Sequence, residues 1–199
     1  YEIVFGDWGS DVCSSDLGTT VGRMSAPVSA TGVAAWLRAF AAAVAAQRDV
    51  LTELDAAIGD ADHGVNMDRG MQAVLAKLDG LATGGVAALL KGVGMTLVST
   101  VGGAAGPLYG TLFLQMGKAA GEEARGDAGG REAGLGLAQW ARVFEAGVAG
   151  VQARGKARLG DKTMVDALVP AAAALRAAAA AETGAPEALR EAANAAERG

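Results

Sequence analysis

Apolar residues recur every three or four positions along most of this chain, which is the spacing of one buried face of an α-helix. The period-two alternation of a half-buried strand is absent, so the sequence predicts an all-α fold. Asp79 and Gly80 are expected to end one helix, Pro107 to begin another, and Asp161 to cap a third. The predicted helices cover approximately residues 30–48, 49–57, 63 or 66 to 78, 86–101, 107–124, 132–152, 162–181 and 186–197.

The composition favours helices that pack closely through small side chains. Hydrophobic residues make up 51% of the 199 residues and aromatic residues only 5%, and alanine is abundant throughout. Alanine is the best helix former, whereas the aromatic side chains that favour strands are sparse. A chain of this length forms one domain with a substantial core.

Charge and cysteine usage narrow the possible partners and location. The formal net charge is -5 and no basic stripe is present, which argues against a nucleic-acid partner. Lys91 and Arg176 interrupt the longest apolar runs, so no segment is expected to span a membrane. The single Cys13 cannot form a disulfide framework, which predicts a cytoplasmic protein.

The first 22 residues differ from the rest of the chain. They contain Cys13 and Trp8 but no alanine, and part of them resembles translated sequencing-adapter sequence. Residues 1–22 are therefore expected to be a non-native or disordered leader, with Met24 as the native start. The domain expected to fold covers residues 24–199.

Three carboxylates crowd into eight positions at Asp55, Asp60 and Asp62, and the chain's only histidine, His63, follows directly. Such like charges repel unless they stay solvated or share a cation. Because the candidate ligands are all oxygens, a hard ion is expected, and the calcium-loop pattern tried from Asp60 lacks its glycine and its glutamate. The sequence therefore favours magnesium, and the alternative is a solvated acidic turn whose aspartates cap helices.

Two other segments are candidates to join the carboxylates, the glycine turn at 102–106 and the turn at 154–164. A glycine run that opens a helix can bind phosphate through its amides, although here the run lacks the P-loop pattern and equally suits a close-packing turn. His63 and Asn66 are each interpreted either as phosphate contacts or as structural residues. Met164 is either beside an adenine ring or part of the core.

The sequence resembles a known family in three ordered segments. Residues 55–67 read DAAIGDADHGVNM, residues 94–110 read GMTLVSTVGGAAGPLYG, and residues 154–164 read RGKARLGDKTM. In this order they resemble the family of nucleotide-binding L subunits of dihydroxyacetone kinases, and the resemblance extends from Val33 to the C-terminus. It implies a barrel of antiparallel helices that holds ADP or ATP and two magnesium ions at one end.

The resemblance also implies residue roles. Asp55, Asp60 and Asp62 correspond to the magnesium ligands, and no residue of the chain is expected to act as nucleophile or general base. The residues implied to bind the nucleotide are His63, Gly64, Val65 and Asn66 at the phosphates, Ala104 and Ala105 on the phosphate-facing turn, and Gly155 and Met164 near the nucleotide.

The family transfers a phosphoryl group to dihydroxyacetone, a ketose that a separate K subunit holds covalently through a histidine. Two donors remain open. In one branch of the family ADP stays bound and is rephosphorylated by a phosphotransferase-system phosphocarrier, and in the other ATP exchanges as a substrate. Phosphoryl transfer needs positioning and charge neutralisation more than covalent help from the protein, which agrees with the candidate residues.

The chain departs from the family in two places. Ala105 stands where serine is usual, and the loss of one hydrogen bond to a charged group costs roughly 1.5–3 kcal/mol. The chain also ends before the family's Gly-Arg segment, Asp-Pro-Gly turn and final helix, so a C-terminal truncation with the last helix missing is expected. A non-catalytic regulatory module is one alternative. Another is a related fatty-acid kinase domain, which usually has threonine in place of His63.

Overall fold

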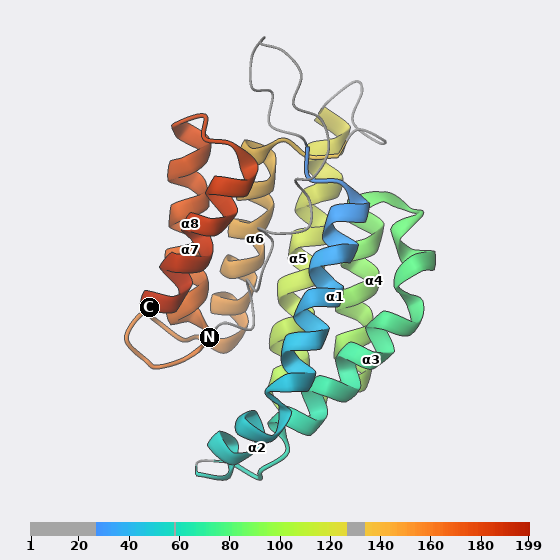
Figure 1. Ribbon diagram of the computed structural model, residues 1–199, viewed down its shortest axis with the longest axis vertical. Coiled ribbons are helices and arrows are strands. Elements are labelled where there is room, and N and C mark those ends of the chain that lie inside the picture. The colour runs from blue at the N-terminus through green and yellow to red at the C-terminus, as the bar shows by residue number, and fades with distance from the viewer. Residues whose placement is uncertain (1–26, 58, 127–133) are drawn as a thin grey trace.

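A computed structural model describes residues 27–57, 59–126 and 134–199, and within these ranges the chain is helical (Figure 1). The all-α prediction is confirmed, since the β-type pairing in the described ranges is one isolated bridge between Val28 and Leu135. The expected leader at 1–22 lies outside the described residues. The helices are α1 Ala30–Ala46, α2 Arg48–Ala56, α3 His63–Ala82, α4 Gly85–Thr100, α5 Ala105–Gly126, α6 Leu137–Gly155, α7 Met164–Ala180 and α8 Ala185–Arg198.

From α3 onward, each helix packs against the one that follows it in the chain, and successive helices run antiparallel (Figure 1). Helix α1 packs on α3 and α4 and reaches α5 and α6 through aromatic rings. The ring centroid of Trp36 lies 5.9 Å from Phe113 and 6.4 Å from Trp140. Among the described helices, α1 packs less closely on α7 and α8 than on α3 and α4.

Alanine allows the close packing that the composition predicted. The pair α7 and α8 meets through fully buried small side chains such as Ala171, Ala188 and Ala192. At the contact of α4 with α5, a Cβ on Gly94 would lie 2.9 Å from the Gly110 carbonyl oxygen, so this pair of glycines lets the two backbones approach. None of the described helices combines the length and the apolar character needed to cross a membrane.

The prediction that Asp79 and Gly80 end a helix is wrong, because α3 continues through both to Ala82. Gly80 is exposed, and a glycine in a helix costs only about 1 kcal/mol, which the neighbouring contacts outweigh. One of these contacts is the ion pair of Asp79 with Arg38 of α1, at 2.5 Å between Oδ1 and Nη2.

The predicted starts of two helices also need correction. Helix α5 begins at Ala105, two residues before Pro107, because a proline in the first turn needs no backbone N–H. Helix α6 begins at Leu137 rather than 132, because Leu135 pairs with Val28 through two backbone hydrogen bonds. The Val28 N–H donates to the Leu135 carbonyl oxygen at 2.7 Å, and the Leu135 N–H donates to the Val28 carbonyl oxygen at 3.0 Å.

The N-cap of α7 is Thr163 and not Asp161. The Thr163 hydroxyl oxygen accepts a hydrogen bond from the Val165 N–H at 3.2 Å. The Asp161 carboxylate instead accepts the N–H of Arg158 at 2.8 Å, within the preceding loop. The acidic residue thus stabilises the loop, and the threonine satisfies the helix start.

Candidate functional site

The antiparallel order brings three connections to one end of the molecule, the lower end in Figure 1. They are the α2–α3 connection at 57–62, the α4–α5 turn at 101–104 and the α6–α7 loop at 156–163. The three segments that the sequence singled out therefore share one end of the bundle.

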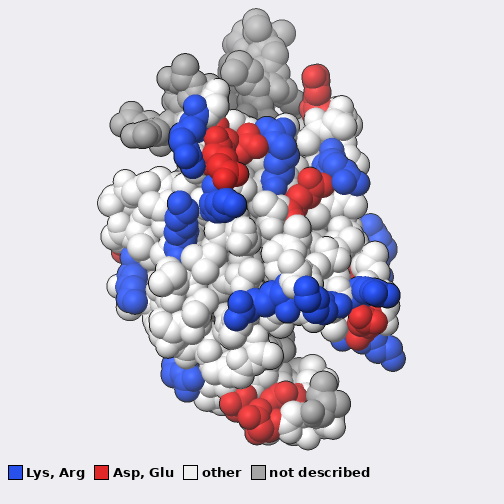
Figure 2. Space-filling model, turned by 180° about the vertical axis from the view of Figure 1, so that it is seen from behind, with Lys and Arg blue, Asp and Glu red and all other residues white. Residues whose placement is uncertain are grey.

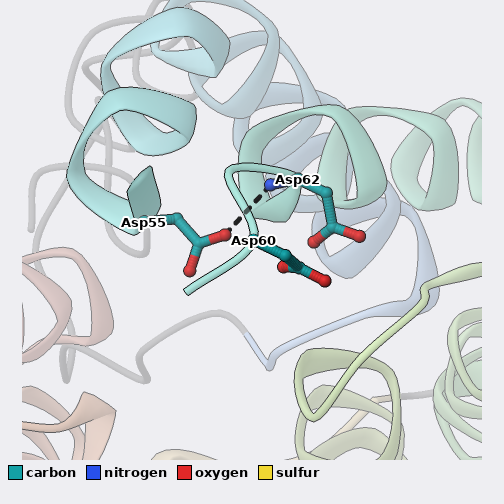
Figure 3. A group of neighbouring side chains, drawn as sticks. All are labelled: Asp55, Asp60 and Asp62. Carbon is teal, nitrogen blue, oxygen red and sulfur yellow. Dashed lines mark hydrogen bonds between the residues drawn. The ribbon is translucent and has the colours of Figure 1, made fainter. Parts of the chain in front are cut away.

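Asp55, Asp60 and Asp62 lie together in the first of these connections (Figure 3). Asp55 is in the last turn of α2, Asp60 is in the connection, and Asp62 immediately precedes α3. One oxygen from each carboxylate lies within 4.8 Å of the others. Asp60 is exposed and the other two are half-buried, so the cluster faces solvent on one side.

The Asp55 carboxylate fixes the start of α3. Its Oδ2 accepts the backbone N–H of Asp62 at 3.0 Å and that of His63 at 3.3 Å, where the positive end of the helix dipole favours an anion. The connection is tight: Ala61 has a φ of 60°, and a Cβ on Gly59 would clash with the Asp55 carboxylate. The turn therefore holds the carboxylates together by its own backbone contacts.

Gly64 is buried where α3 meets α2. A Cβ at this position would clash with the Arg48 carbonyl oxygen and the Thr52 hydroxyl, so only glycine allows the two helices to approach. The next residue, Val65, points outward and is 48% exposed. The first turn of α3 thus has one face against α2 and one face open.

Asn66 links α3 to the glycine turn. Its side chain is 6% exposed, and its Oδ1 accepts a hydrogen bond from Arg69 Nη2 at 2.6 Å. Arg69 Nε also donates to the Thr100 carbonyl oxygen at 3.2 Å, at the end of α4. Arg69 was not predicted as a site residue, although its place three residues after Asn66 on a helix was an available signal.

The α4–α5 turn presents backbone groups at the start of α5. Gly103 has a φ of 62°, Ala104 is exposed and Ala105 is half-buried. A Cβ at position 106 would clash with the Val101 carbonyl oxygen, so this position requires the glycine that is found there. The N-terminus of α5 carries amides without helical partners, which is a favourable place for an anion.

A carboxylate that was not predicted as a site residue, that of Asp166, organises the α6–α7 loop. Asp166 accepts the N–H of Gly160 at 2.6 Å and that of Thr163 at 2.9 Å. These hydrogen bonds lower the pKa of Asp166, and the bond from Gly160 has the largest effect. Lys156 and Lys162 have positive φ angles in this loop, of 59° and 56°. The Thr-x-x-Asp spacing of a capping box was the signal in the sequence.

An apolar cavity of about 330 Å³ lies beside the carboxylates, between α1, α2, α3, α5, α6 and α7. His63 and Met164 both line it, so the structure brings these two predicted residues together. Gly155 is not among the lining residues; it is exposed at the end of α6, where a Cβ would lie 3.1 Å from Leu108.

Charge is unevenly distributed around this end of the molecule. Figure 2 shows acidic side chains gathered at the end that carries α2 and a band of Lys and Arg side chains nearer the middle of the same face. Arg154, Lys156, Arg158 and Lys162 are all exposed around the α6–α7 loop. The arrangement offers oxygen ligands for a cation and nearby positive charge for an anion.

Residues 57–199 match the DAK2 domain family, and the chain belongs to that family. The ADP-binding subunit of the PEP-dependent dihydroxyacetone kinase of Escherichia coli is 41% identical over 170 residues, which are 85% of this chain and 77% of that subunit. The ADP-binding subunit of the PTS-dependent dihydroxyacetone kinase of Lactococcus lactis is 42% identical over 131 residues, 66% of this chain and 61% of that subunit. These relatives are named as kinase subunits, so the predicted resemblance and the phosphotransferase class are confirmed.

The fold has a counterpart among solved structures. The dihydroxyacetone kinase from C. freundii, in complex with AMP-PNP and Mg2+, matches with a TM-score of 0.61 and 22% sequence identity. The match covers 94% of this chain and 38% of that chain. At this identity the match establishes a shared helical fold.

Proposed function

We propose that this chain is the Mg-nucleotide-binding subunit of a dihydroxyacetone kinase and transfers a phosphoryl group to dihydroxyacetone held on a partner K subunit. The observation that carries the proposal is the group of three carboxylates at the start of α3, in a chain 41% identical to an ADP-binding kinase subunit. The cytoplasm is the proposed location, supported by the lack of cysteine pairs that could form disulfides in residues 24–199.

The donor set fits magnesium. Asp55, Asp60 and Asp62 offer hard oxygen ligands within 4.8 Å of one another, and solvent access on one side leaves room for waters and phosphate oxygens. By the family resemblance two ions are proposed at these three residues. Bound magnesium would neutralise the charge on the phosphate oxygens that the aspartates otherwise repel.

The nucleotide is proposed to lie across the three connections. The free amides at the start of α5 favour its phosphates, and the apolar cavity lined by His63 and Met164 offers a surface for the base. Ala105 lacks the hydroxyl usual in the family, so the backbone donates there. The residues proposed to contact the nucleotide are His63, Gly64, Val65, Asn66, Ala104, Ala105, Gly155 and Met164.

The chain's role is to position the reactants. The part of the chain that the structure describes offers no activated nucleophile at this end, and none is needed, because the hydroxyl of the ketose attacks the phosphoryl group. The names of the Escherichia coli and Lactococcus lactis relatives, PEP-dependent and PTS-dependent, support ADP that stays bound and is rephosphorylated by a phosphocarrier protein. Exchange of ATP is the alternative donor route.

Calorimetric titration of ADP into the full chain, with and without magnesium, tests the site. Magnesium-dependent binding is expected, and a folded protein that binds no ADP in either condition would contradict the proposal. Transfer is then tested with a K subunit loaded with dihydroxyacetone. Nucleotide binding without transfer would instead support a regulatory module, and phosphorylation of a carrier-bound fatty acid would support the fatty-acid kinase alternative.

A further inference from the structure

We propose that Arg69 is a positioning residue that orients the Asn66 carboxamide, so that its NH2 group faces the glycine turn and donates to a nucleotide phosphate. The inference deepens the proposed function and rests on it. Arg69 is exposed on α3, and its proposed role is to hold Asn66 rather than to contact the nucleotide itself.

The hydrogen bond between the two side chains determines which way the amide points. Arginine carries only N–H donors, so the Asn66 atom that lies 2.6 Å from Arg69 Nη2 must be the oxygen. The NH2 group is then directed away from the guanidinium. Without Arg69 the amide is free to turn by 180° and present its oxygen, which repels a phosphate.

The NH2 group of Asn66 lies beside the glycine turn. A Cβ built on Gly102 would lie 3.1 Å from Asn66 Nδ2, which is the nearest atom to it outside the turn. Asn66 is only 6% exposed, and no residue in the described part of the chain accepts a hydrogen bond from Nδ2. Because no fully buried polar side-chain atom of the described residues lacks a hydrogen-bond partner, Nδ2 is open to solvent, and a phosphate oxygen at the start of α5 would take the place of water there.

The same guanidinium fixes the turn relative to Asn66. Arg69 Nε donates to the carbonyl oxygen of Thr100, the last residue of α4, where the negative end of the helix dipole favours a cation. One rigid planar group therefore bridges α3 and the end of α4. A lysine has a single ammonium group on a flexible stem and cannot hold both acceptors in this fixed geometry.

A double-mutant cycle in the full chain tests the proposal. Magnesium-dependent ADP affinity is measured by calorimetry for the unaltered chain, Asn66→Ala, Arg69→Met and the double variant. Each single change is expected to weaken binding about tenfold, and the double variant no more than either single, because Arg69 acts through Asn66. Arg142→Met is the matched control. It removes an exposed arginine of α6 that pairs with Glu123 of α5, and the ADP affinity of this variant should be unchanged.

Arg69→Lys separates orientation from charge. If the amide is held by the fixed two-bond geometry of the guanidinium, the lysine variant binds as weakly as Arg69→Met; restored affinity would mean that a flexible cation suffices and would overturn the role assigned to Arg69. Additive losses in the cycle, or full affinity in Arg69→Met, would also overturn it. Thermal unfolding confirms that each variant is folded, and Asn66→Ser replaces Asn66→Ala if that variant is not. An unaltered chain that binds no Mg·ADP overturns the proposed function together with this inference, whereas failure of the cycle alone leaves the function intact.

Discussion

Replacement of Asp60 by asparagine should change ligand binding and stability in opposite directions. Asp60 is exposed, and no described residue donates a hydrogen bond to its side chain, unlike Asp55, which holds the start of α3. The change Asp60→Asn therefore removes one negative charge and one metal ligand without breaking a structural contact.

The magnitude follows from the spacing of the carboxylates. Two unit charges 4.8 Å apart repel by about 0.9 kcal/mol at the dielectric constant of water, so Asp60 takes part in two repulsions that total about 2 kcal/mol. Screening at physiological salt roughly halves this value, and part of the repulsion persists in the unfolded chain because the residues are close in sequence. We expect the metal-free variant to be more stable by up to about 1 kcal/mol.

Magnesium-dependent ADP binding should weaken at the same time, by at least tenfold or about 1.4 kcal/mol, because one of three candidate ligands is lost. The assays are thermal unfolding with and without magnesium and calorimetric titration of ADP. Glu122→Gln, which removes an exposed carboxylate on α5 far from the site, is the control and should change neither value. Unchanged affinity in folded Asp60→Asn would refute the metal assignment, and a loss of metal-free stability would refute the electrostatic reasoning.

Three further predictions concern stability. Gly64→Ala should destabilise the fold by about 1–3 kcal/mol in urea unfolding, because its Cβ clashes with the Arg48 carbonyl oxygen, whereas Gly80→Ala on the same helix meets open space and should be neutral or stabilising by up to about 1 kcal/mol. Asp166 has a lowered pKa because of the hydrogen bonds it accepts, so its contribution is complete above the ordinary aspartate pKa near ~3.9 and is lost as the pH falls through its folded-state value. The difference in unfolding free energy between the unaltered chain and Asp166→Asn should therefore shrink between pH 5 and pH 3. Trp36→Ala should cost about 3–5 kcal/mol, since the ring is buried against two aromatic rings of α5 and α6.

Each of these has a clear contrary result. Equal effects of the two glycine variants would mean that the contact of Gly64 with α2 does not determine the stability. An Asp166 contribution that grows on acidification would contradict the direction of its pKa. A loss below about 1 kcal/mol for Trp36→Ala would mean that α1 is not anchored on the other helices by this ring.

Local sequence features predicted the helices well where the signal is periodic and failed where it depends on neighbours. The ranges of α1, α2 and α4 were predicted within two residues, because three- and four-residue spacing is a property of one segment. The end of α3 was missed, since the pairing of Asp79 with Arg38 joins residues 41 positions apart. The N-cap of α7 was misplaced because two polar residues competed for it, and the loop geometry assigned Asp161 to Arg158.

The sequence by itself determined the helical class, the family and the group of three aspartates, because each of these is written in residues that lie close together in the chain. The tertiary structure decided which distant groups meet. It placed the Thr100 carbonyl oxygen, 31 positions away, beside Arg69, and it brought His63 and Met164 to one cavity. Such contacts depend on how whole helices pack, and helix packing is set by many small apolar contacts that no short stretch of sequence contains.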